Sequence, residues 1–200
     1  MVQRGGREAA QRLAELRQPP HLRAQVRRFV ETEIQPHAEA WEEAGEVPRW
    51  AWTKAGELGF LCAAIPAESG GVGGDRRHSI ILMEEQARLN LTGLGFALHS
   101  DIVAPYIDHY GTEAQKKAWL GKMTSGDLIT GIAMTEPGGG SDLKALRTMA
   151  VRDGDEYVIT GQKTFITNGQ TADMFLVACK TDRAAGAKGI SLIAVEADRP

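Results

Sequence analysis

The chain has 200 residues with 42% hydrophobic and 24% charged content, which suits one large or two small globular domains. A formal net charge of −3 argues against a basic surface that binds nucleic acid. No apolar run approaches the roughly 20 residues that a membrane-spanning helix requires, so we expect no membrane span. The two cysteines, Cys62 and Cys179, lie far apart without metal-ligand spacing, so we expect neither a disulfide framework nor a metal site. The composition predicts a soluble protein of the cytoplasm.

Up to about Met123 the apolar residues recur at three- and four-residue spacing, which is typical of amphipathic helices. This spacing predicts helices over residues 26–34, 50–58, 80–87 and 94–110. The last of them is strongly apolar and is expected to be buried. Thr112 and Gln115 form a capping-box pattern, which predicts a further helix that runs to Met123.

Beyond Leu128 the pattern changes to that of strands. Runs rich in β-forming residues predict strands over 157–160, 163–167, 174–178 and 190–195, the first two paired as a hairpin around Gly161. No alternation of strands and helices is present, which argues against a Rossmann fold. The predicted fold is α+β: an N-terminal all-helical bundle over residues 21–127, then an antiparallel β-barrel or sandwich over residues 128–200.

One segment has the residue types of a ligand-binding loop. Residues 131–142 join an apolar run to a turn that holds one proline and three consecutive glycines. Glycines let backbone N–H groups come close to a bound group, and Thr135 and Ser141 add side-chain donors and acceptors. This composition suits a polar, planar or phosphate-bearing ligand. A loop that merely reverses the chain is an equal alternative.

A second segment combines an aromatic ring with a hydroxyl group. Phe165 and Thr167 stand two apart on the expected strand, so both would project from one face. Such a pair suits an aromatic cofactor, which the ring would stack against and the hydroxyl would hydrogen-bond. The alternative is a core phenylalanine and an exposed threonine before an Asn-Gly turn.

Other polar and aromatic residues give weaker signals. Glu84 and Glu85 look like paired carboxylates, but adjacent helix positions point in different directions, so we interpret them as a solvated face. Three tryptophans are expected in the core rather than on a stacking surface: Trp41, Trp50 and Trp52.

Together these segments resemble the acyl-CoA dehydrogenase family. Four stretches match its sequence signatures in the family's order: residues 65–71, 110–116, 134–142 and 165–169. The resemblance runs from about His21 to Pro200. Residues 41–47, residues 95–106 and Phe165 place it nearest to the long-chain subgroup, and in a eukaryote it implies a location in the mitochondrial matrix. Residues 1–20 are expected to form an extension that need not be ordered.

The resemblance implies FAD as cofactor and assigns binding roles to eight positions: Ile132, Met134, Thr135, Gly140, Ser141, Phe165, Ile166 and Thr167. The Thr135 hydroxyl would bond the pyrimidine edge of the isoalloxazine, and the Thr167 hydroxyl would lie near its N5. Ser141 would meet the FAD pyrophosphate and would also approach the acyl-CoA substrate.

The resemblance further implies the α,β-dehydrogenation of acyl-CoA thioesters to trans-2-enoyl-CoA, with electrons passed to an electron-transfer flavoprotein. In the family, a glutamate of the C-terminal helical domain acts as the base. Because the sequence ends at Pro200, inside the β-domain, we expect no catalytic base in it and interpret Glu136 as a turn or salt-bridge residue. We expect a fragment, a truncated reading frame, or one half of a split protein completed by another chain or in a homo-oligomer.

Two other interpretations stay open. A flavin oxidase or flavin monooxygenase of the same fold would share the glycine-rich loop and the Phe165 segment. A non-catalytic chain, which binds a partner protein or nothing, would share them as well.

Overall fold

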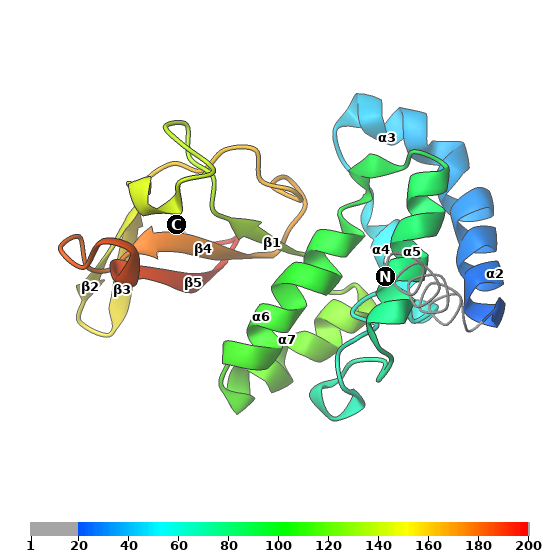
Figure 1. Cartoon of the computed structure of the whole chain (residues 1–200), viewed down its shortest axis with the longest axis horizontal. Helices are drawn as coiled ribbons and strands as arrows, with labels where there is room; N and C mark the ends of the chain where they lie inside the picture. The colour runs from blue at the N-terminus through cyan, green and yellow to red at the C-terminus, as the bar shows by residue number, and fades with distance from the viewer. Residues whose placement is uncertain (1–19, 200) are drawn as a thin grey trace, which may run out of the picture. The chain divides into compact units, whose positions relative to one another are not determined.

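The computed structural model describes residues 20–199 (Figure 1). The chain divides into two compact units, a helical one that ends at Asp127 and one built around a sheet that begins at Leu128. Helices followed by a sheet confirm the predicted α+β class. The extension expected over residues 1–20 lies, apart from Pro20, outside the described residues. Across the described part of the chain, no helix is long and apolar enough to cross a membrane.

The helices of the first unit follow local signals in the sequence. Its α-helices, as far as the structure describes them, are α2 (Pro20–Phe29), α3 (Ala38–Ala44), α4 (Arg49–Glu57), α5 (Arg76–Arg88), α6 (Ala104–Tyr110) and α7 (Glu113–Ser125). The capping box before α7 is confirmed. The Thr112 hydroxyl accepts a hydrogen bond from the Gln115 amide, and the Gln115 side chain accepts one from the Thr112 amide at 2.8 Å.

The core of the helical unit centres on Trp52 of α4, which is fully buried. Its ring packs edge-on against Phe96 and His99, with ring centroids 4.7 and 5.3 Å apart. The Nε2–H of His99 donates to the Met123 carbonyl of α7 at 3.0 Å, and burial lowers the pKa of His99 to about 4. Trp50 was expected in the core but is 42% exposed, because residues two apart on a helix point to opposite sides.

Glu85 of α5 is buried, so its interpretation as part of a solvated face was wrong, whereas its neighbour Glu84 does lie at the surface. The Glu85 carboxylate accepts hydrogen bonds from Arg23 and Arg27 of α2, each at 2.9 Å, and from Arg88 of α5 at 3.1 Å. The hydrogen bond from Arg27 is the largest cause that lowers the pKa of Glu85 to about 2, against the opposing effect of burial. The spacing of Arg23 and Arg27, one helical turn apart on α2, was the signal in the sequence from which this cluster could have been predicted.

The second unit is a five-stranded sheet among the described residues: β1 (Thr130–Ala133), β2 (Met149–Asp153), β3 (Glu156–Thr160), β4 (Met174–Lys180) and β5 (Ile190–Glu196). Strand β4 pairs antiparallel with β5 along its whole length. It pairs parallel with β1, whose Thr130 lies opposite Met174. Strand β2 meets β4 at one position and forms an antiparallel hairpin with β3. Figure 1 shows β4, in orange, running through the middle of this sheet.

The predicted strands at the end of the chain are confirmed by β4 and β5, but two other predictions need correction. The sheet is mixed rather than antiparallel, because the long connection after β1 lets the chain return in the same direction before β4. Residues 163–167 form no strand, and β3 pairs with β2 instead. The reason is that Phe165 and Asn168 have φ values of 55° and 64°, which no extended strand accommodates.

Candidate functional site

The two segments that the sequence singled out, residues 131–142 and residues 162–169, lie side by side in the sheet unit. The first leaves the end of β1, and the second follows β3. Two hydrogen bonds, each 3.0 Å long, join them: Thr164 N–H to the Thr135 carbonyl, and Lys163 Nζ to the Met134 carbonyl. A third, also 3.0 Å long, runs from Asn168 Nδ2 to the carbonyl of Thr130, the residue just before the first segment. The predicted residues of both segments therefore stand next to each other.

The eight predicted cofactor residues differ in their exposure. Ile132 is buried in β1, and Met134, Thr135 and Ile166 are half-buried. The exposed members are Gly140, Ser141, Phe165 and Thr167. Two of the residues lie against one another, because a Cβ on Gly140 would stand 3.5 Å from Cγ2 of Thr135. Polar and apolar groups are thus exposed together where β1 ends.

The fold of the described residues does not require glycine at positions 138, 139 and 140. A Cβ on Gly138 or Gly139 would meet no atom within 4 Å, and none of the three has a positive φ. Gly131 differs, because a Cβ there would stand 3.0 Å from the ring of Phe175. Glycine at 138–140 therefore leaves free space outside the loop, while glycine at 131 makes room inside the sheet.

Phe165 is presented to solvent in an uncommon way. Its side chain is 93% exposed, and its backbone lies in the left-handed region that bulky residues rarely adopt. The argument that Phe165 and Thr167 share one face of a strand was wrong, because both lie in an irregular segment that ends in a turn. Unfavourable backbone conformations of this kind cluster at binding sites, where the fold holds them in place.

Glu136 anchors the base of the glycine-rich loop and is only 8% exposed. Its carboxylate accepts hydrogen bonds from the backbone amides of Arg147 and Thr148 at 2.7 and 2.9 Å, and from Lys163 Nζ at 2.9 Å. Burial raises the pKa of Glu136, but the hydrogen bonds from these groups outweigh it and hold the pKa at about 2. The interpretation of Glu136 as a turn or salt-bridge residue is confirmed. Its partner Lys163 was not predicted, because the two residues stand 27 positions apart.

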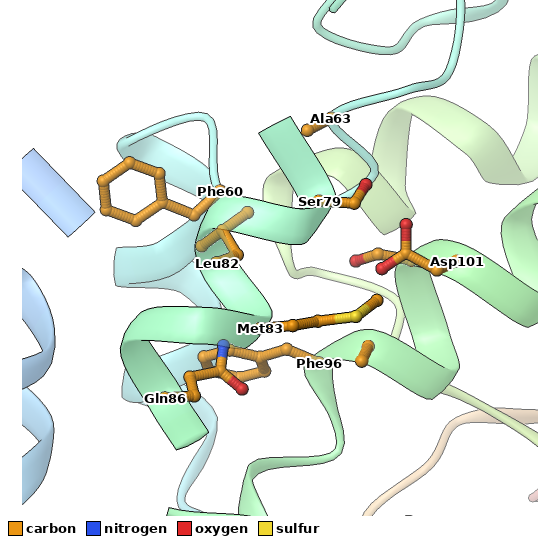
Figure 2. Close-up of a pocket in the computed structure, with 10 residues that line it drawn as sticks. Phe60, Ala63, Ser79, Leu82, Met83, Gln86, Phe96 and Asp101 are labelled. Atoms are coloured by element: carbon orange, nitrogen blue, oxygen red, sulfur yellow. The ribbon is translucent and has the colours of Figure 1, made fainter. Parts of the chain in front are cut away.

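Two cavities of the helical unit are lined by none of the predicted cofactor residues. One of about 10 Å³ is lined by α5 and the residues before α6, with Ser79 and Asp101 on one side (Figure 2). It has room for about one water molecule. A more open cleft of about 630 Å³ shares Ser79, Met83 and Asp101 with it. Burial raises the pKa of the Asp101 carboxyl, an effect that Ser79 and Arg76 partly offset.

Comparison with protein families accounts for both units. Residues 19–127 match the model of the acyl-CoA dehydrogenase N-terminal domain, and residues 131–200 match that of the middle domain. The chain belongs to the acyl-CoA dehydrogenase family. The change from one matched domain to the other falls where the chain passes from α7 to β1.

Named relatives and solved structures of the family agree with this assignment. The mitochondrial long-chain specific acyl-CoA dehydrogenase of Sus scrofa is 51% identical over 177 residues, which are 88% of this chain and 41% of that protein. A crystal structure of an acyl-CoA dehydrogenase from Geobacillus kaustophilus matches with a TM-score of 0.85 and 52% identity, covering 89% of this chain and 47% of that one. A glutaryl-CoA dehydrogenase from Mycobacterium smegmatis, solved in complex with FADH2, matches with a TM-score of 0.81 and 31% identity, covering 90% of this chain and 46% of that one. The chain spans less than half the length of these relatives.

Proposed function

We propose that this chain forms the flavin-facing part of an enzyme that uses FAD to dehydrogenate acyl-CoA thioesters to trans-2-enoyl-CoA. Membership of the acyl-CoA dehydrogenase family over both units supports the reaction class. The 51% identity to a long-chain enzyme supports a fatty acyl-CoA as substrate. When bound, FAD would supply the acceptor for the hydride that leaves the β-carbon of the acyl group. We propose an electron-transfer flavoprotein as the partner that takes the electrons.

The observation that carries this proposal is the exposed triplet Gly138–Gly140. Side chains at the first two positions would point into open space. None of the three glycines has a positive φ, so residues with a side chain could adopt the same backbone conformation. The missing side chains therefore leave room for a group that is not part of the described residues. A pyrophosphate is such a group, because it binds where backbone N–H groups can approach it closely. We assign Gly140 and Ser141 to the pyrophosphate, and Ser141 also to the acyl-CoA.

The remaining predicted residues fit a planar ring with polar edges. Ile132 and Met134 would offer an apolar surface, and the exposed ring of Phe165 would pack beside the flavin together with Ile166. The hydroxyls of Thr135 and Thr167 would donate hydrogen bonds to the edge of the ring. Donors placed there stabilise negative charge as it develops on the ring, so they would assist the transfer of hydride electrostatically.

Neither buried glutamate of the described residues suits the base that removes the α-proton. The carboxylates of Glu85 and Glu136 are bonded to arginine or lysine, and each has a pKa of about 2. A general base needs an accessible group with a pKa nearer the working pH. We therefore propose that the base comes from a part of the enzyme other than residues 20–199.

Titration with FAD tests the assignment of the glycine loop. We expect the chain to quench flavin fluorescence, and the variant Gly139→Leu to weaken FAD binding by at least about tenfold, because its side chain fills the space left for the ligand. The control Val158→Thr changes an exposed position on the β2–β3 hairpin and should bind FAD as the original chain does. Equal affinity in all three proteins would contradict the assigned role of the loop.

Assays of the product test the reaction class. The chain would be incubated with FAD, butyryl-CoA or palmitoyl-CoA, and an electron-accepting dye, and the enoyl-CoA product measured. Because we place the base elsewhere, we expect flavin binding without turnover. Turnover by this chain alone would show that the base lies within it, and formation of hydrogen peroxide would favour an oxidase of the same fold.

A further inference from the structure

The ion pair of Glu136 and Lys163 connects three parts of the sheet unit that are distant in sequence. The Glu136 carboxylate holds the backbone amides of Arg147 and Thr148, immediately before strand β2. The Lys163 ammonium donates to the same carboxylate at 2.9 Å and to the Met134 carbonyl at 3.0 Å. The pair thus joins the end of β1, the start of β2 and the segment after β3.

Both members of this ion pair are shielded from water. The side chain of Lys163 is 11% exposed and that of Glu136 is 8% exposed. A buried pair of this kind contributes little net stability, because the cost of removing two charges from water offsets their attraction. Apolar residues of similar volume could fill the same space, but they could not accept hydrogen bonds from the amides of Arg147 and Thr148. A buried charged pair therefore suggests that the geometry it imposes has a use.

The geometry that it imposes concerns the residues assigned to the flavin. Lys163 binds the carbonyl of Met134, and the next residue, Thr164, donates its amide to the carbonyl of Thr135 at 3.0 Å. Phe165 follows directly and has the uncommon positive φ of 55°. A bonded lysine two residues before Phe165 can restrict the backbone from which this ring projects.

We propose that Glu136 and Lys163 are positioning residues, whose ion pair fixes the distance between the end of β1 and the Phe165 segment and so presets the two walls of the flavin site. The identity of the ligand between these walls rests on the proposed function. The connection between the two segments does not rest on it. Glu136 and Lys163 act through Thr135 and Phe165 and need not touch the cofactor.

Three variants and one control separate this role from general stabilisation. Lys163→Met removes the ammonium but keeps an apolar stem of similar length, and Lys163→Arg keeps the charge and the donors. Glu136→Gln keeps the shape of the side chain and removes its charge. The control Arg152→Met opens an exposed ion pair with Asp155 on the β2–β3 hairpin of the same unit.

Hydrogen exchange of the 200-residue chain, measured by NMR, tests the connection without any ligand. In Lys163→Met we expect the amide of Thr164 to exchange at least about tenfold faster, since its segment loses two of the bonds that hold it. In Glu136→Gln the amides of Arg147 and Thr148 should respond as well, because an amide side chain has one carbonyl acceptor instead of two. Amides between β4 and β5 should keep their rates in every variant.

Binding of FAD then tests the positioning role. We expect Lys163→Met to weaken FAD binding by about tenfold and to alter the visible absorption bands of bound flavin, which respond to the polarity and packing around the ring. Lys163→Arg should recover most of the affinity and the original spectrum, and Arg152→Met should change neither. A merely structural ion pair would change the unfolding midpoint and leave the spectrum of bound FAD as it is.

Two results would overturn the inference, and each can be told apart from a failure of the proposed function. Unchanged exchange of Thr164 in Lys163→Met would show that the pair does not hold this segment, whether or not FAD binds. Faster exchange with unaltered FAD affinity and spectrum would show that the pair positions nothing at the site. If the original chain binds no FAD, the proposed function fails for this chain, and with it the claim that the pair presets a flavin site.

Discussion

The helical unit and the sheet unit each bury a glutamate, and the partners of the two carboxylates differ. Glu85 is surrounded by three arginine side chains, two from α2 and one from its own helix α5. Glu136 accepts hydrogen bonds from two backbone amides and one lysine. Both carboxyl groups have a pKa of about 2, so both are charged at neutral pH.

The difference lies in what each carboxylate fixes. The arginines around Glu85 are themselves partly exposed, Arg27 by 48% and Arg88 by 39%, and they connect two helices through side chains. Their arrangement holds the packing of α2 against α5. The Glu136 carboxylate binds main-chain amides directly, those of Arg147 and Thr148, and it meets the segment after β3 through the Lys163 side chain. The first carboxylate joins two helices through side chains, and we propose that the second holds the backbone around a binding site.

The largest expected effect follows from removing the glutamate of the helical unit. Glu85→Ala leaves Arg23, Arg27 and Arg88 close together without their shared counter-ion, which should lower the free energy of unfolding by about 3 to 4 kcal/mol. Urea unfolding followed by tryptophan fluorescence measures this unit alone, because all four tryptophans precede Asp127. The control Glu113→Ala, in an exposed pair with Lys116, should change the free energy by less than about 0.5 kcal/mol. A loss for Glu85→Ala as small as the control's would refute the stabilising role.

Acid should weaken the two units at different pH values. The pKa of His99 falls from 6.5 to about 4 on burial, so its neutral form stabilises the helical unit above pH 6.5. This contribution, up to about 3 kcal/mol, should be lost as the pH falls from 6.5 to 4. The pKa of Glu136 falls from 4.5 to about 2, so its contribution is complete above pH 4.5 and is lost only between pH 4.5 and 2.

Unfolding at pH 7 and pH 5 measures this difference. Tryptophan fluorescence should show a lower urea midpoint for the helical unit at pH 5. The protection of the β4 amides, taken relative to the intrinsic exchange rate at each pH, should be the same at pH 5 as at pH 7. The variant His99→Gln should lose the part of the pH dependence that belongs to the histidine. Equal acid sensitivity of both units above pH 4.5 would contradict the comparison.

Two glycines of the sheet unit should respond oppositely to alanine. At Gly161 a Cβ would stand 2.7 Å from Cα of Thr148, so Gly161→Ala should cost about 1 to 3 kcal/mol and disturb the residue that donates to Glu136. At Gly139 a Cβ meets nothing within 4 Å, so Gly139→Ala should be neutral or stabilise by up to about 1 kcal/mol. Amide exchange of β4 measures both effects, and a destabilising Gly139→Ala would show that this glycine does serve the fold.

The smallest effect on stability is expected at Phe165, where the effect on binding should be large. The ring is 93% exposed, so Phe165→Ser should change the free energy of unfolding by less than about 0.5 kcal/mol. The same variant should weaken FAD binding by about tenfold, because stacking against the ring is lost. A loss of stability that matches the loss of binding would mean that Phe165 packs within the protein instead.

Elements with local signals were predictable from the sequence. The capping box of Thr112 and Gln115 and the apolar runs of β4 and β5 depend on residues a few positions apart, and the structure contains all of them. The segment after β3 was mistaken for a strand. Its β-forming composition suggested pairing, but Phe165 adopts left-handed backbone, for which the sequence held no local signal. The left-handed backbone of Asn168 agrees with the Asn-Gly turn that the sequence offered as an alternative.

The sequence by itself determined that a helical unit precedes a sheet unit, where the glycine-rich loop lies, and the family to which both units belong. Each of these depends on residue types and spacings that are local in the chain. Only the tertiary structure decided which charges are buried and what they bind. Glu85 meets Arg23 across 62 positions and Glu136 meets Lys163 across 27, and no periodicity links residues so far apart. The parallel pairing of β1 with β4 was decided in the same way, because strand direction depends on the path of the chain between them.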